Sequence, residues 1–133
     1  MIKRALGCLA LMGLMTGALL AHHSLAGVYD MKADKEVTGA VAKVQFVNPH
    51  GSLTIAVKNP DGTSTNWVFT MGSATALATR NVGLTGPNAL HVGDQVTIHC
   101  LPAINGSPLG FLKTVKFPDG HTVVISMGNN PNE

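Results

Sequence analysis

The sequence predicts a mainly β fold, a small OB-like barrel of five or six strands with one short helix between strands three and four. Short runs of alternating apolar residues recur along the chain, and Asn-Pro, Pro-Asp-Gly and Gly-rich turns separate them. One central segment has helical spacing instead. Three strands, a helix and then two or three strands is the order of an OB-type barrel, with a small sandwich as the alternative.

The first strand is predicted at residues 36–47, a long run rich in valine. Gly39 lies inside this run and indicates a bend or a bulge. Such a feature fits a barrel, because closure needs one strand that serves both of its halves. The sequence Asn48-Pro49-His50-Gly51 then ends the strand with turn residues.

The next two strands form a predicted hairpin. Apolar and polar residues alternate from Leu53 to Val57, which is typical of a half-buried strand. A turn at residues 59–62, Asn-Pro-Asp-Gly, leads into the third strand, Ser64 to Thr70. We place Trp67 and Phe69 of this strand on opposite faces, one in the core and the other on an exposed patch.

The helix and the remaining strands follow. Ser73 is a suitable N-cap for a short helix that ends near Arg80, and a glycine-rich loop comes next. Alternation predicts a fourth strand over residues 96–100, with a fifth at 109–117 and a last one at 121–126. Cys100 shares the alternation of the apolar residues in its strand, so we expect it in the core.

Residues 1–21 read as a secretory signal peptide. Lys3 and Arg4 precede an uncharged apolar run from Ala5 to Leu20, and Ala21 offers a small residue at the cut. A rival cut after Ala26 would remove both histidines that follow. An uncleaved membrane anchor is a further alternative, although roughly sixteen apolar residues are short for a span.

The predicted organisation is a signal peptide (1–21), an N-terminal segment (22–34), the barrel domain (35–127) and a disordered tail (128–133). Cleavage of 21 residues from 133 leaves 112, enough for one domain. Of the nine basic residues, seven remain and balance the seven acidic ones, so we expect no nucleic-acid partner. After cleavage we expect no membrane anchor, and the localisation is periplasmic or secreted in a bacterium.

Four short motifs support a family resemblance. They are His22-His23-Ser24, Asn48-Pro49-His50, Asn66-Trp67 and Val92-Gly93-Asp94. With these motifs the chain resembles an uncharacterised family of exported bacterial OB-like domains, over nearly the whole mature length. It departs from the family pattern at Val92, where proline is usual, and at Gly51, where a larger residue is common. The resemblance implies the fold and export, and it carries no function.

Three histidines form the candidate metal site: His22, His23 and His50. Cleavage after Ala21 would leave a free amine on His22, and this amine closes a chelate ring with the imidazole of the same residue. Two imidazoles and an amine are the nitrogen-rich donor set that copper(II) prefers. His50, in a turn after the first strand, is the expected third ligand. His91, His99 and His121 are interpreted as ordinary surface or turn residues.

The sequence therefore predicts a periplasmic, non-enzymatic binding protein that holds copper through an N-terminal histidine site. One alternative is a metal-free OB-like module that binds a peptide, a glycan or a partner protein, and an unknown periplasmic partner fits either reading. Another is an oxidoreductase in which the N-terminal histidine activates oxygen. Sequence signatures of hydrolases, zinc proteases and phosphate-binding loops are missing from the chain, which favours the non-enzymatic reading.

Overall fold

The protein is a small β-barrel with one short helix inserted into it, as the sequence predicts. The structure, a computed structural model, describes residues 25–127. Its elements are α2 (Leu25–Val28), β1 (Lys35–Gln45), β2 (Ser52–Lys58), β3 (Ser64–Thr70), α3 (Ala74–Thr79), β4 (Val82–Gly83), β5 (Asn88–Ala89), β6 (Gln95–Pro102), β7 (Leu109–Lys116) and β8 (Thr122–Val124).

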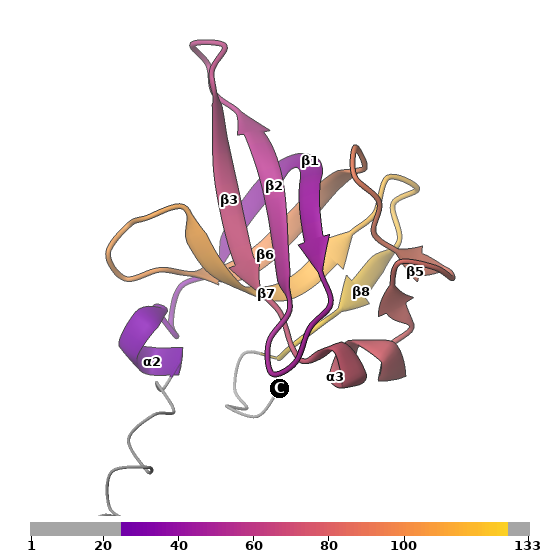
Figure 1. Cartoon of the computed structure of the whole chain (residues 1–133). Coiled ribbons are helices and arrows are strands. Elements are labelled where there is room, and N and C mark those ends of the chain that lie inside the picture. Colours follow the sequence, from indigo (N-terminus) through magenta and orange to yellow (C-terminus); the bar gives the residue numbers. More distant parts are fainter. Residues whose placement is uncertain (1–24, 128–133) are drawn as a thin grey trace, which may run out of the picture.

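Five strands close the barrel. The main sheet has the order β3-β2-β1-β6-β7-β8, and an additional pairing of β3 with β7 joins the sheet to itself (Figure 1). The closing pair is parallel and runs from Val68 opposite Leu109 to Thr70 opposite Phe111. All other pairings in this sheet are antiparallel. This connection order gives the OB-like topology, with β8 as an extra strand on the outside of β7.

Strand β1 is shared by the two halves of the barrel. Its first half pairs with β6 and its second half with β2, and Ala40 takes part in both ladders. A Cβ atom on Gly39 would lie 2.5 Å from the Ala56 carbonyl oxygen, so this close approach requires glycine. The register shifts between Val41 and Lys43. The predicted bend is therefore present, with the bulge just after Gly39.

The core fills the inside of the barrel. Its fully buried strand side chains include Phe69, Leu53, Ile55, Ile98 and Leu112. Helix α3 adds the buried Leu77, and it starts at the predicted N-cap, because Ser73 Oγ accepts a hydrogen bond from the Ala76 amide at 3.1 Å. This helix lies against one end of the barrel (Figure 1).

The expectation that Trp67 and Phe69 lie on opposite faces of β3 is wrong. Residues two apart on a strand point to the same face, and the two rings stack at 6.0 Å between centroids with 17° between planes. Phe69 is fully buried and Trp67 half-buried at the margin of the core. The Lys35 ammonium lies 5.5 Å from the Trp67 ring centroid and covers its outer side.

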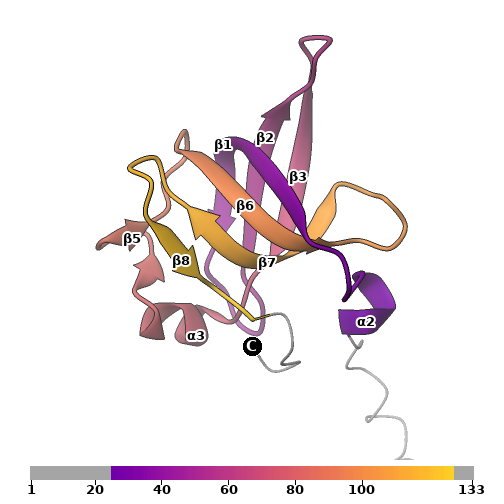
Figure 2. The same cartoon turned by 180° about the vertical axis from the view of Figure 1, so that it is seen from behind.

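The two ends of the barrel differ in what they carry. Helix α2, the turn between β1 and β2, and helix α3 lie at one end, whereas the β2–β3 hairpin extends from the other (Figures 1 and 2). The hairpin turn follows the prediction, with Gly62 at φ 86° and its amide bonded to the Asn59 carbonyl oxygen at 3.0 Å. Below, the end with α2 is called the turn end.

Candidate functional site at the turn end

Of the three predicted metal ligands, the structure describes one. His22 and His23 lie outside residues 25–127, and so does the proposed cut after Ala21. His50 is exposed in the β1–β2 turn, after a cis peptide bond between Asn48 and Pro49. Within the described part of the chain, no hydrogen bond or ion pair joins the His50 ring to another residue.

The turn that presents His50 is fixed to the barrel at its base. The Gly51 amide donates to the Gly72 carbonyl oxygen at 3.0 Å, and the Met71 amide donates to the Gly51 carbonyl oxygen at 2.9 Å. Gly51 is buried, and a Cβ atom there would lie 2.6 Å from the Gln45 carbonyl oxygen. Backbone contacts therefore fix the position from which the exposed His50 side chain projects.

The N-terminal segment is fastened to the same end of the barrel. Tyr29 is buried, and its hydroxyl group forms a hydrogen bond with Thr70 Oγ1 at 2.8 Å. Its ring packs on Phe111, with 5.8 Å between centroids. Backbone hydrogen bonds on either side of Tyr29 tie the segment to the β6–β7 loop, from Ile104 N to Val28 O at 3.0 Å, and to the end of β6, from Asp30 N to Pro102 O at 2.9 Å.

These contacts connect the N-terminal segment to the His50 turn. Thr70, which holds the Tyr29 hydroxyl group, is the strand partner of Ser52, and Ser52 follows His50 by two residues. Both views show α2 and the β1–β2 turn at the turn end (Figures 1 and 2). In five-stranded OB-type barrels, ligands bind near the loop between strands 1 and 2 and the loop between strands 4 and 5. Here the first corresponds to the β1–β2 loop, which carries His50. The second corresponds to the β6–β7 loop, which contacts α2.

The described residues alone form no metal cluster. Among residues 25–127, no three His, Cys, Asp or Glu side chains are grouped so that they could hold an ion together. No helix in the same range is long and apolar enough to cross a membrane. Cys100 lies in the core as predicted, and burial raises the pKa of its thiol to about 11, so the thiol stays protonated at neutral pH.

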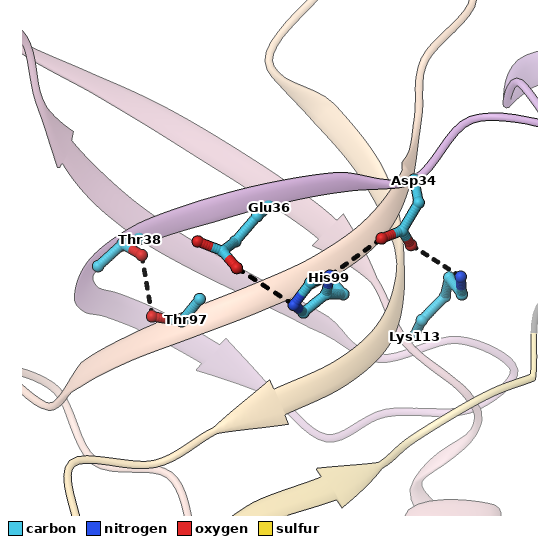
Figure 3. Close-up of polar contacts among 6 residues, drawn as sticks. All are labelled: Asp34, Glu36, Thr38, Thr97, His99 and Lys113. Atoms are coloured by element: carbon cyan, nitrogen blue, oxygen red, sulfur yellow. Dashed lines mark hydrogen bonds and ion pairs between the residues drawn. The ribbon is translucent and has the colours of Figure 1, made fainter. Parts of the chain in front are cut away.

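His99 lies on the surface, as the alternation predicts, and it has charged partners there that the sequence does not reveal. It lies half-buried on the outer face of β6, and both ring nitrogens face carboxylates (Figure 3). Nδ1 is 3.0 Å from Asp34 Oδ2, and Nε2 is 3.3 Å from Glu36 Oε2. Lys113 Nζ donates to the other oxygen of Asp34 at 2.8 Å. We call Asp34, Glu36, His99 and Lys113 the outer-face cluster.

The outer-face cluster joins the end of the N-terminal segment to two strands of the barrel. The hydrogen bond from Lys113, and then the one from His99, hold the pKa of the Asp34 carboxyl group below its usual value, so Asp34 is ionised at neutral pH. A depression of about 500 Å³ lies over the cluster, and threonine side chains of β6, β7 and β8 together with Lys116 complete its lining. Sequence reasoning missed the cluster because it depends on the register that sets Glu36 opposite His99.

His91 and His121 also have acidic neighbours. His91 Nδ1 is 3.6 Å from Asp94 Oδ2. His121 Nδ1 contacts Asp119, its Nε2 is 3.1 Å from Asn88 Oδ1, and its ring stacks on Phe117 at 4.4 Å. Each of these two residues therefore pairs with an aspartate two or three positions away in its own turn.

Comparison with known proteins finds one match. A family of unknown function, DUF6152, matches residues 10–113, which is most of the chain. No curated protein and no solved structure matches it. The resemblance to an uncharacterised family is thereby confirmed, while export and the His-His-Ser and Asn-Pro-His motifs stay predictions.

Proposed function

Since this chain belongs to DUF6152, a family of unknown function, we propose a function from its own chemistry: an exported, non-enzymatic domain that binds one copper ion. The proposed ligands are the amine and ring of His22 and the ring of His50, with His23 assisting. The proposed location is the bacterial periplasm, after removal of residues 1–21.

The observation that carries the proposal is the state of His50. His91, His99 and His121 each lie within 4 Å of a carboxylate oxygen. His50 is exposed and has no such neighbour in the described part of the chain. A metal ligand must offer an imidazole nitrogen lone pair that no proton occupies. Of these four rings, that of His50 is the one with no carboxylate contact within residues 25–127, so it is the one left open to a metal ion.

The second support is where the N-terminal segment leaves the barrel. Tyr29 anchors this segment at the turn end, and α2 begins at Leu25. His22 lies three positions before Leu25, and an extended chain spans roughly 10 Å over three positions. A free amine at His22 would therefore start from the same end of the barrel that presents His50, which suits one site with donors from both segments.

The donor chemistry selects copper. An amine and two imidazoles form a set of nitrogen ligands, and copper(II) binds such sets more tightly than the other divalent first-row metals. A metal-free interaction module and an oxygen-activating copper site are the outcomes that compete with this proposal. The first would bind no copper, and the second would consume oxygen in the presence of a reductant.

The first experiment reads the N-terminus of the exported protein by intact mass. A chain that starts at His22 is expected, because the apolar run ends at Leu20 and a small residue follows. A chain that starts at Gly27 would lack both histidines and would contradict the proposed site.

The second experiment titrates copper(II) into the mature protein and into a form whose His22 amine is acetylated. Acetylation removes the amine from the donor set, so the affinity should fall at least tenfold. His50→Ala should also weaken binding, whereas His91→Ala, a matched change in another exposed turn, should not. Equal affinity of the native and acetylated forms would show that the terminal chelate is not the site.

A further inference from the structure

We propose that residues 25–30 act as a strap that holds the barrel shut where β3 pairs with β7, and that the barrel opens at this pairing when the strap is released. The pairing of Val68–Thr70 with Leu109–Phe111 is called the seam below, and residues 25–30 are called the strap. The strap contains none of the copper ligands proposed above, so its role is independent of the proposed function.

The seam is the shortest pairing in the ring of five strands. It joins three residues of each strand, whereas the β2–β3 ladder joins seven and the other three ladders of the ring join five or six. It is also parallel, and parallel pairing is slightly less stable per residue than antiparallel pairing. Proteins open locally where the fewest interactions hold an element in place. The ring of strands should therefore open at the seam before it opens elsewhere.

Tyr29 of the strap contacts both strands of the seam at the same place. Its hydroxyl group forms a hydrogen bond with Thr70 Oγ1 of β3 at 2.8 Å, and its ring packs on Phe111 of β7 with 5.8 Å between centroids. Thr70 and Phe111 are direct partners in the parallel pairing. Tyr29 is only 6% exposed, so water competes little for these contacts. A single side chain therefore links the two strands where the ring closes.

The strap also covers an apolar patch on the outside of the seam. Gly110 faces the interior, where a Cβ atom would lie 2.8 Å from Cys100 Sγ, so the next residue, Phe111, faces outward. Phe111 is nevertheless only 1% exposed. It is buried in a small cluster, separate from the main core, that consists of Tyr29, Leu101 and Phe111 with Leu25 and Leu109 packed against them. Leu25 and Tyr29 belong to the strap, so its release would expose Phe111 to water, and this hydrophobic cost opposes release.

The strap is held more firmly on the β7 side of the seam than on the β3 side. Backbone hydrogen bonds of Val28 and Asp30 tie it to the β6–β7 loop and to the end of β6. Within the described part of the chain, the hydrogen bond between Tyr29 and Thr70 is the one that ties it to β3. Tyr29→Phe removes one of these hydroxyl groups and Thr70→Val removes the other. Each change should therefore detach the strap from β3 and leave its ring packing in place.

The test measures amide hydrogen exchange by NMR in the mature protein with a chelator present, so the result does not depend on the copper site. The reporter is the Val68 amide, which donates to the Pro108 carbonyl oxygen at 3.0 Å beside the seam. The reference is the Val41 amide, which donates to the Asp94 carbonyl oxygen at 2.8 Å next to the β1–β6 ladder. Tyr29→Phe loses one hydrogen bond, so it should speed the exchange of Val68 about two- to tenfold and leave that of Val41 unchanged.

Three further variants test the cause of the change. Thr70→Val should speed the exchange of Val68 as Tyr29→Phe does, and the double variant should add nothing, because both changes remove the same hydrogen bond. Thr97→Val, a matched loss of a hydrogen-bonded hydroxyl group on the outer face, should leave the exchange of Val68 unchanged. Unchanged exchange of Val68 in Tyr29→Phe would overturn the proposal. An equal increase at Val68 and Val41 would overturn it as well, because the barrel would then open as a whole.

Discussion

The inner face of strand β6 is apolar and buried, whereas its outer face is polar and partly exposed. Val96, Ile98 and Cys100 point inward, and each is at most 1% exposed. Thr97 and His99 point outward between them. Their polar atoms contact Thr38 and Glu36 of the neighbouring strand β1, and Asp34, which directly precedes that strand. The inward residues contribute buried apolar area, whereas the outward ones contribute donors and acceptors that exchange partners with water.

The two faces of β6 therefore contribute differently to the stability of the barrel. Each buried side chain removes about 1.5–3 kcal/mol of apolar hydration cost from the folded state. Exposed hydrogen bonds and ion pairs contribute less, because water competes for the same groups. We therefore expect the inner face to control whether the barrel folds and the outer face to contribute little to its stability. Three substitutions test this separation, in order of falling effect.

Ile98→Ala should give the largest loss of stability. The Ile98 side chain is fully buried in the core, and its removal loses transfer free energy and leaves a cavity, together about 2–5 kcal/mol. Urea unfolding of the mature protein measures the change. Thr97→Ala, the neighbouring change on the outer face, should cost less than about 1 kcal/mol. Similar losses for the two variants would contradict the comparison of the faces.

Gly110→Ala should have an intermediate effect at the strand pairing that closes the barrel. A Cβ atom on Gly110 would lie 2.8 Å from Cys100 Sγ and 3.0 Å from the Phe69 ring. Overpacking of this kind costs about 1–3 kcal/mol. Thermal unfolding of Gly110→Ala and of the double variant Gly110→Ala/Cys100→Ala checks the cause. The double variant should recover part of the loss, and if it does not, the sulfur contact is not the source.

Asp34→Asn should have the smallest effect, and the effect should depend on pH. The pKa of the Asp34 carboxyl group is lower in the folded protein, chiefly through the Lys113 hydrogen bond. Its contribution to stability is therefore present above the ordinary value of 3.8 and is lost as the pH falls through the lower folded-state pKa. Because the side chain is half exposed, we expect about 1 kcal/mol or less at pH 7.

The measurement compares the unfolding free energies of wild type and Asp34→Asn at pH 7 and pH 3. The difference in unfolding free energy should be smaller at pH 3, where the wild-type carboxyl group approaches protonation. When both proteins also carry Lys113→Met, this difference should already be small at pH 7. A difference that stays constant over this range would show that the ion pair adds nothing to stability.

The sequence predicts the fold better than the site because strands depend on local patterns. Alternation and turn residues locate β2 and β3 within one residue, and Ser73 marks the start of α3. The sequence does not reveal α2 or the short β4–β5 pair, because four-residue and two-residue elements have too few positions for a period. The parallel closure of β3 on β7 is likewise a tertiary contact without a local signal.

The candidate metal ligands and the outer-face cluster differ in the same way. His50 is a candidate because its turn motif is continuous in sequence, and its role, like those of His22 and His23, stays a prediction. Alternation places His99 on the surface, because alternation gives the face of a strand but not its partner across the ladder. Once the register places Glu36 opposite it and brings Asp34 to its ring, the same histidine belongs to a charged cluster.

The closing contact between β3 and β7 also determines when the domain can fold. Val68 pairs with Leu109, so the ring of strands stays open until residues 109–111 are available. Pairings between such distant segments form slowly, because the intervening chain must first lose its conformational freedom. Before residue 109 emerges from a ribosome, β3 lacks the strand that joins it to the rest of the ring. The hairpin of β2 and β3 must therefore wait for a strand made about forty residues later before the barrel can close.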